Sequence, residues 1–215
     1  MNIKRIGIAI VGCGMIGQFH LKAMKDVPEF EIVGVWDAEA SLSANVATEW
    51  NTKSFSSFGE ILNDPRVNLV DICLPSARHA EYGCMAADTG KHVIVEKPID
   101  VTVEAARRLV DACRDSEVSL AVILQNRFSP SVAKVKKALD ENVLGRLLYG
   151  EATIKWYRPE SYYTSRQQRG TLQYDGGGAL MNQGIHTIDL LLWFMGNVKS
   201  TRSLVRTSLH PIKVE

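Results

Sequence analysis

The sequence lacks the marks of several protein classes. No apolar run approaches the roughly 18 residues that a transmembrane helix needs. The 25 lysines and arginines are scattered along the chain and balance 24 aspartates and glutamates, so there is no basic stripe for nucleic acid. Histidines and cysteines show no zinc-ligand spacing. We therefore expect no membrane span, no nucleic-acid partner and no bound metal.

Cysteine usage and the N-terminus favour a cytoplasmic protein. The four cysteines include no CxxC pair, and Cys73 and Cys113 fall in a strand-like and a helix-like run. That placement suits small buried side chains in a reducing compartment. The apolar stretch 6–11 has six residues, fewer than the roughly 7–15 of a secretory signal.

The first part of the chain alternates short β-branched runs with amphipathic segments. A length of 215 residues corresponds to about one and a half domains. Parallel strands need crossover helices between them, so this alternation predicts an α/β domain with a doubly wound parallel sheet over residues 1–124. We expect strands over 6–11, 32–36, 69–74, 92–95 and 119–124, and helices over 17–25, 41–50, 80–89 and 103–116.

After Gln125 the pattern changes to that of a partial α+β domain over residues 125–215. The pattern predicts a helix over 131–142, strands over 146–156 and 201–210, and an apolar helix from the Gly176–Gly178 turn to about 195. An aromatic- and arginine-rich loop is expected over 157–174. A terminal strand without a partner in the sequence leaves an exposed sheet edge.

A glycine-rich motif follows the first strand. It reads Gly12-Cys13-Gly14-Met15-Ile16-Gly17, a G-x-G-x-x-G in which the glycines allow a tight turn, a close backbone approach to a pyrophosphate and close helix packing. The helix N-terminus adds N–H groups and partial positive charge. A purely structural glycine turn is the alternative. Gly12, Gly14, Met15, Ile16 and Gly17 are thus candidate cofactor contacts.

Asp37 strengthens the dinucleotide hypothesis. It ends the second predicted strand, twenty residues after Gly17, where a carboxylate accepts hydrogen bonds from the adenosine ribose. A carboxylate there repels a 2′-phosphate, and residues 38–40 include no lysine or arginine. The expected cofactor is therefore NAD rather than NADP.

Further motifs point to one family. They are Pro75-Ser76-Ala77-Arg78-His79, the run GKHVIVEKP over 90–98, Asn126-Arg127-Phe128, and GGGAL with GIHTID between Gly176 and Asp189. With them the chain resembles the Gfo/Idh/MocA oxidoreductases over nearly its whole length. The resemblance implies a Rossmann domain, a second domain with an open antiparallel sheet, and hydride transfer at a sugar, polyol or nucleotide-sugar hydroxyl. It also implies a homodimer or homotetramer formed through the C-terminal sheet.

Lys97 is a candidate catalytic, cofactor-binding and substrate-binding residue. It follows a predicted parallel strand, at the edge where open α/β sheets bind ligands, and the neighbouring Glu96 is placed to hold its ammonium. A solvated surface lysine is the alternative. Pro75, His79 and Glu96 are further candidate cofactor contacts, although a structural role is more typical of a histidine at the start of a helix, as His79 is.

The last apolar helix carries a polar stripe. Asn182, His186 and Asp189 are spaced i, i+4 and i+7 and share one face. Burying unpaired polar groups costs about 1–3 kcal/mol each, so they need partners. A satisfied structural histidine is the alternative. The resemblance makes His186 the catalytic histidine; several members place an aspartate four residues earlier, and Asn182 cannot take a proton, which puts a relay there in doubt.

The remaining candidates are substrate contacts. Tyr157 and Arg158 supply an aromatic face, which suits a sugar ring, and a guanidinium, which suits carboxylate or phosphate; solvated loop residues are the alternative. Asn126, Arg127, Asn182, His186 and Asp189 complete the candidate set.

These observations predict an NAD-dependent dehydrogenase in which His186 removes the hydroxyl proton and Lys97 stabilises the alkoxide. The alternatives are a non-catalytic dinucleotide-binding regulator and an inactive fragment of such a dehydrogenase. For the 215-residue chain itself we expect NAD binding, weak or no turnover, and self-association through the C-terminal strands.

Overall fold

The computed structural model describes residues 5–164, 169–207 and 209–214. The chain forms two compact units, residues 1–123 and residues 124–215, which are described separately.

The first unit contains one parallel sheet of six strands in the order β3-β2-β1-β4-β5-β6. Its strands are β1 (Ile6–Val11), β2 (Phe30–Trp36), β3 (Lys53–Ser54), β4 (Leu69–Ile72), β5 (His92–Glu96) and β6 (Leu120–Ile123). Its helices are α1 (Met15–Met24), α2 (Ala40–Glu49), α3 (Phe58–Asn63), η1 (Ser76–Arg78), α4 (His79–Asp88) and α5 (Val103–Asp115). This architecture confirms the predicted doubly wound parallel sheet. The strand order reverses between β1 and β4, which makes their carboxyl ends the switch point where such sheets bind ligands.

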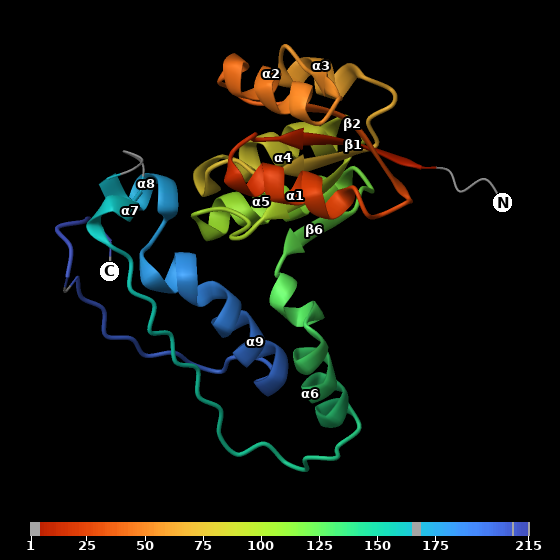
Figure 1. Cartoon of the computed structure of the whole chain (residues 1–215). Coiled ribbons are helices and arrows are strands. Elements are labelled where there is room, and N and C mark those ends of the chain that lie inside the picture. Colours follow the sequence, from red (N-terminus) through yellow and green to blue (C-terminus); the bar gives the residue numbers. More distant parts are fainter. Residues whose placement is uncertain (1–4, 165–168, 208, 215) are drawn as a thin grey trace. The chain divides into compact units, whose positions relative to one another are not determined.

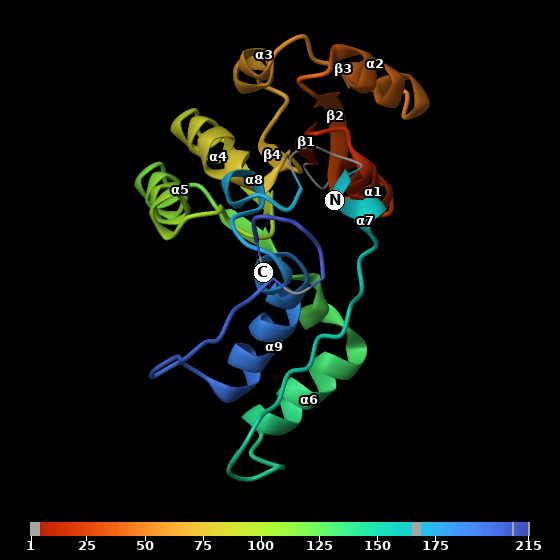
Figure 2. The same ribbon diagram turned by 90° about the vertical axis from the view of Figure 1, so that its left-hand side faces the viewer.

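Helices cover both faces of this sheet, α1 and α2 on one side and α3, α4 and α5 on the other (Figure 2). Along β1, Ile8 and Ile10 pack toward the first pair, while Ala9 and Val11 pack toward the second group. A strand covered on both faces is apolar throughout rather than alternating. This is why the continuous runs in the sequence mark these strands correctly.

The sequence analysis missed two elements of this unit, β3 and α3. β3 has two residues, too few to show any periodicity. α3 begins after Ser57, whose Oγ accepts a hydrogen bond from the Glu60 N–H, and Glu60 reaches back to the Ser56 N–H at 2.8 Å. Ser57 followed three residues later by Glu60 is the pattern of a capping box, a signal that predicts this helix start.

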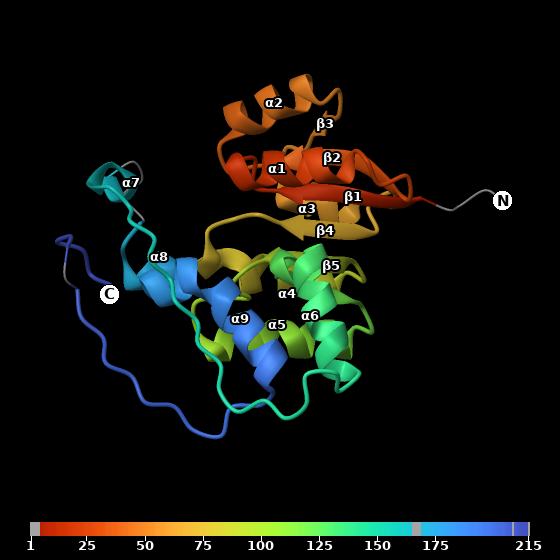
Figure 3. The same ribbon diagram turned by 60° about the horizontal axis from the view of Figure 1, so that its bottom comes forward.

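The described part of the second unit is helical, and both strands predicted for it are wrong. Its elements are η2 (Gln125–Phe128), α6 (Pro130–Asp140), α7 (Glu160–Thr164), α8 (Leu172–Asp175), the π-helical turn η3 (Leu180–Gly184) and α9 (Ile185–Met195). The short helix α7 lies within the predicted 157–174 loop, and the short helix α8 begins within it. Residues 146–156 and the described part of 201–210 form irregular chain (Figures 1 and 3).

The reason for this error is that a strand is stable only when a neighbour pairs its N–H and C=O groups. Alternating side chains indicate which faces a strand would present, but they do not supply the neighbour. Residues 124–164, 169–207 and 209–214 accordingly contain no open antiparallel sheet.

No helix of the described residues is long and apolar enough to cross a bilayer. The four cysteines are free thiols. Cys113 is buried, as its position in the sequence indicates, whereas Cys73 is only partly buried.

Candidate active site

The glycine loop between β1 and α1 has the geometry that the motif predicts. Gly12 has φ of 101°, and a Cβ there would lie 2.7 Å from the Cys73 carbonyl oxygen. A Cβ on Gly17 would overlap the carbonyl oxygen of Gly12. Gly14 is the N-cap of α1, no side chain caps the helix, and its first turn has no acidic residue. The first N–H groups of α1 are therefore suited to an anion.

Replacing Gly17 with alanine is expected to lower the free energy of unfolding by about 1–3 kcal/mol, because the loop and helix must move apart to admit the methyl group. The same movement displaces the N–H groups of the loop, so NADH affinity should fall as well. Chemical denaturation and fluorescence titration measure the two effects. Gly59→Ala is the matched control, since its nearest atom, Ser57 Oγ, is at 3.8 Å; equal losses in both variants would contradict the prediction.

Asp37 fastens the glycine loop to the turn after β2. Its Oδ2 accepts a hydrogen bond from the Cys13 N–H at 2.8 Å, and its Oδ1 accepts one from the Glu39 N–H at 2.9 Å. Each carboxylate oxygen has a second lone pair, so the group can still accept hydrogen bonds from a ligand.

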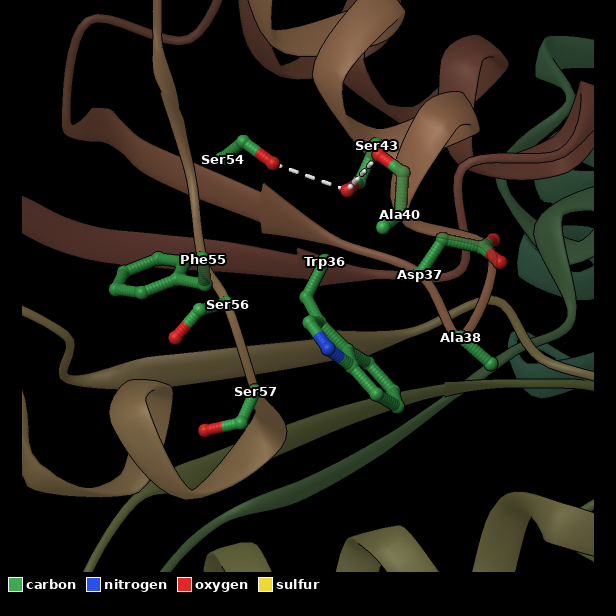
Figure 4. Close-up of a pocket in the computed structure, with 9 residues that line it drawn as sticks. All are labelled: Trp36, Asp37, Ala38, Ala40, Ser43, Ser54, Phe55, Ser56 and Ser57. Carbon is green, nitrogen blue, oxygen red and sulfur yellow. Dashed lines mark hydrogen bonds between the residues drawn. The ribbon is translucent and has the colours of Figure 1, made fainter.

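A cavity of about 410 Å³ lies beside Asp37 (Figure 4). The end of β2, the start of α2 and the segment 54–57 line it, and Ser43 and Ser54 hydrogen-bond across it at 3.0 Å. Its lining residues are Trp36, Asp37, Ala38, Ala40, Ser43, Ser54, Phe55, Ser56 and Ser57. They include no lysine or arginine, so no cation of the lining would offset a second negative charge next to Asp37.

Pro75 and His79 lie in the chain after β4. Pro75 is the N-cap of η1. The His79 ring is buried, with Nδ1 2.7 Å from the Pro98 carbonyl oxygen and Nε2 2.8 Å from that of Leu74, and burial lowers its pKa. The ring connects the end of β4 with the chain after β5, which supports the structural role over cofactor contact.

Lys97 follows β5 directly and is half-buried, and its peptide bond to Pro98 is cis. The sequence leaves that isomer open. The Glu96 carboxylate, which we expected to hold the Lys97 ammonium, accepts a hydrogen bond from the Lys97 backbone N–H at 3.0 Å. Glu96 therefore acts on Lys97 at least through its backbone.

A buried polar cluster under this turn was missed by the sequence analysis. His20 Nδ1 lies 2.8 Å from Asp71 Oδ2, and His20 Nε2 lies 3.2 Å from Glu96 Oε1. The side chains of His20 and Asp71 are 9% and 0% exposed. The signals in the sequence are an aspartate within the apolar run 69–74 and a histidine on the apolar face of α1, because buried charges need partners.

His20, Asp71 and Cys73 also have the composition of a metal site, but their spacing is that of hydrogen bonds. Two ligands of a tetrahedral zinc ion at about 2.0–2.1 Å would lie about 3.3 Å apart, whereas the His20 and Asp71 atoms are 2.8 Å apart. A proton between nitrogen and oxygen accounts for that distance.

In the second unit, Arg127 and Asp189 form a bidentate ion pair. Arg127 Nε donates to Asp189 Oδ2 at 2.8 Å and Nη2 to Oδ1 at 2.5 Å, and these bonds raise the pKa of Arg127. The guanidinium also lies 5.3 Å from the Trp193 ring. Asp189, a candidate substrate contact, thus has Arg127 as a partner on both oxygens.

Arg158 and Asn182 converge on Tyr162. The Tyr162 hydroxyl accepts a hydrogen bond from Asn182 Nδ2 at 3.3 Å, and the Arg158 guanidinium lies 5.1 Å from the Tyr162 ring centre. Asn182 belongs to η3, while His186 and Asp189 belong to α9. The Tyr157 and His210 ring centres lie 6.1 Å apart, with the ring planes tilted by 40°. Asn126 lies in η2.

Comparisons with known proteins identify both units. Residues 6–124 match the model of an oxidoreductase family with an NAD-binding Rossmann fold, and residues 132–215 match the GFO/IDH/MocA C-terminal domain. The WlbA dehydrogenase of Bordetella pertussis, solved with NADH and UDP-GlcNAcA, is 31% identical with a TM-score of 0.94; the match covers 100% of this chain and 64% of that one.

Two curated relatives are also similar. Levoglucosan dehydrogenase of Pseudarthrobacter phenanthrenivorans is 29% identical over 95% of this chain and 55% of its own length. The scyllo-inositol 2-dehydrogenase (NADP(+)) of Bacillus subtilis is 28% identical over 95% of this chain and 56% of its own length. The chain spans somewhat more than half the length of these relatives. The match over both units confirms the resemblance: the chain belongs to the Gfo/Idh/MocA family of oxidoreductases, and its first unit is an NAD-binding Rossmann domain.

Proposed function

We propose that this chain is part of an NAD-dependent dehydrogenase that oxidises a hydroxyl group of a sugar, polyol or nucleotide sugar. One observation carries the proposal. Candidate residues follow the carboxyl ends of four neighbouring strands in one parallel sheet. They are Asp37 after β2, the glycine loop after β1, Pro75 after β4 and Lys97 after β5. This is the edge where open α/β sheets bind ligands.

The residues at this edge fit a dinucleotide. The N–H groups at the start of α1 suit a pyrophosphate, the Asp37 carboxylate suits ribose hydroxyls, and the neighbouring cavity has room beside Trp36. Bound NAD supplies the hydride acceptor. With no cation in the cavity lining, Asp37 favours NAD over NADP, although one relative is named an NADP(+) enzyme.

In the proposed chemistry, His186 accepts the proton of the substrate hydroxyl as a general base, and Lys97 donates a hydrogen bond to the developing alkoxide. The two roles are complementary, because removal of the proton leaves a negative charge that an ammonium stabilises. Asn182 cannot accept the proton from His186, so the proton passes from the imidazole to solvent or to another group.

The substrate class follows from the second unit and from the relatives. Arg158 and Arg169 both lie against the Tyr162 ring, at 5.1 and 4.2 Å, an arrangement that suits a sugar bearing a carboxylate or phosphate. Asn126, Arg127, Tyr157 and Asp189 are the other proposed contacts. The bound ligand of the Bordetella pertussis structure, UDP-GlcNAcA, belongs to that class. We further propose a cytoplasmic homo-oligomer, with residues 1–124 binding the cofactor and residues 125–215 contributing to the substrate side.

Calorimetric titration with NADH, followed by a screen of sugars, inositols and nucleotide sugars for NADH formation, tests the proposal. We expect NADH binding and single-turnover oxidation of at least one compound. NADH binding without oxidation of any compound would favour a dinucleotide-binding regulator or an inactive fragment. Absence of NADH binding would contradict the cofactor site itself.

A further inference from the structure

We propose that His20 is a positioning residue that holds Glu96, and through Glu96 the backbone of Lys97, at the carboxyl end of β5. The inference rests on the proposed function, because the position of Lys97 matters for turnover only if Lys97 acts on the substrate. Nothing in the family match or in the names of the relatives assigns a role to His20, which lies on the covered side of α1.

A continuous set of hydrogen bonds carries the proposal. It runs from Asp71 of β4 to His20 of α1 at 2.8 Å, from His20 to Glu96 of β5 at 3.2 Å, and from Glu96 to the Lys97 N–H at 3.0 Å. The two oxygens of Glu96 are thus used in different ways, Oε1 by the imidazole and Oε2 by the Lys97 backbone. The carboxylate cannot rotate without breaking one of the two bonds.

As an imidazolium, the His20 ring donates a hydrogen bond to each of its two carboxylate partners. Each ring nitrogen faces a carboxylate oxygen, and a neutral imidazole has only one N–H to donate. The titratable groups that face the ring are Asp71 of β4, Cys73 directly after β4, and Glu96 of β5, with Lys97 next to Glu96. A neutral ring would need a protonated Asp71 as the donor to Nδ1, and burial raises the pKa of Asp71; our proposal is the imidazolium between two carboxylates.

The balance of burial and hydrogen bonding agrees with this charge state. Burial alone would lower the pKa of His20, but its bonds to Asp71, Cys73 and Glu96 outweigh burial and raise the pKa to about 12. Burial alone would raise the pKa of Glu96, but the bond from His20 outweighs it and lowers the pKa. The ring accordingly keeps its charge throughout the range in which dehydrogenases are assayed.

A cluster that served only the fold would look similar, so the test needs a readout that separates the two roles. Removing the negative charge of Asp71 provides it. In Asp71→Asn the burial of His20 is no longer offset by its nearest carboxylate, so the pKa of His20 should fall by about 1–3 units. The ring then loses its proton toward the alkaline end of the assay range and releases Glu96.

The first measurement is ¹⁵N NMR of the imidazole rings in the full chain, with the five histidines assigned from the backbone. In the parent chain the His20 ring should stay doubly protonated from about pH 6 to about pH 9, whereas an unperturbed histidine titrates near 6.5. A His20 ring that titrates near that value in the parent overturns the proposal, and this measurement requires neither turnover nor a variant.

The second measurement is the single-turnover rate of Asp71→Asn and His20→Gln, with NADH affinity determined alongside. In Asp71→Asn the single-turnover rate should fall about tenfold or more as the pH rises through the new His20 pKa. The rate of the parent chain should show no such decrease with rising pH. In His20→Gln the rate should be about tenfold lower at every pH, with NADH affinity unchanged. Leu21→Val, a buried apolar change in the same turn of α1, is the control and should keep the parental rate and pH profile.

The outcomes separate this inference from the function on which it rests. Turnover in the parent together with a pH-independent rate in Asp71→Asn overturns the role of His20 alone. Variants that lose rate, NADH affinity and thermal stability in parallel show a cluster that only supports the fold, which also overturns it. A parent without turnover on any compound overturns the proposed function and this inference together, while the NMR titration still reports the charge of His20.

Discussion

Lys97→Ala is expected to lower the single-turnover rate of hydroxyl oxidation by about 10²–10³-fold while leaving NADH affinity unchanged. The reason is that a donor aimed at a developing oxyanion stabilises the transition state far more than the ground state. Lys97 lies at the end of β5, and the glycine loop and Asp37 lie at the ends of β1 and β2. Its loss should therefore leave dinucleotide binding intact, so we propose Lys97 as a catalytic and substrate contact rather than a cofactor contact. Stopped-flow recording of NADH formation, with calorimetry for binding, measures both quantities.

Two further variants sharpen this experiment. Lys97→Met retains the length of the side chain without its charge and should be as slow as Lys97→Ala. Lys22→Ala removes an exposed lysine of α1 and should behave as the parent. A Lys97→Ala chain that turns over within about threefold of the parent would leave Lys97 without a part in the chemistry, since loss of one such donor is expected to cost about 10²-fold or more.

NADH is expected to bind the parent chain at least about tenfold more tightly than NADPH, a difference of about 1.4 kcal/mol. The 2′-phosphate would meet the Asp37 carboxylate, and no cation in the lining of the neighbouring cavity compensates for that contact. In the double variant Asp37→Ser with Ala38→Arg, a repulsive contact is exchanged for an attractive one, so the order of affinities should reverse. Fluorescence titration with both dinucleotides measures the change.

Glu39→Gln is the matched control for this reversal. Glu39 lies in the same turn, and its backbone N–H bonds to Asp37 Oδ1, so the substitution removes one negative charge while that backbone bond is retained. Its preference for NADH should change little. Equal affinities of NADH and NADPH in the parent chain would place Asp37 away from the adenosine ribose. The Cys13 N–H loses its carboxylate acceptor in the double variant, so some loss of NADH affinity is expected there as well.

How far the sequence predicts this protein depends on how local each feature is. The runs that became β1, β2, β4, β5 and β6 were recognised because strands covered on both faces are apolar along their whole length. The glycine loop was recognised because side chains are excluded there, at Gly12 by its positive φ and at Gly17 by the close Gly12 carbonyl oxygen. α3 was missed although Ser57 and Glu60 carry a capping signal, and β3 gave no signal because it has two residues.

The predicted strands over 146–156 and 201–210 show where a local sequence pattern fails to predict structure. Alternation is a property of one segment, whereas a strand is a relation between two, so a sequence pattern can be strand-like where no described neighbour pairs with it. The same holds for the polar stripe of Asn182, His186 and Asp189. Its spacing was evident from the sequence, but the partners of Asp189 and Asn182, which are Arg127 and Tyr162, were not.

The sequence by itself determined the parallel sheet, the glycine loop and the position of Asp37 at the end of β2, because each depends on residues close together in the chain or on a fixed spacing between them. Only the tertiary structure decided which charges meet in the interior. His20 lies 51 residues from Asp71 and 76 from Glu96 in the chain, and no local pattern connects them. Burial leaves each of these groups without water, so each needs a hydrogen-bonding or charged partner inside the fold. The tertiary structure supplies these partners, because it brings α1, β4 and β5 together.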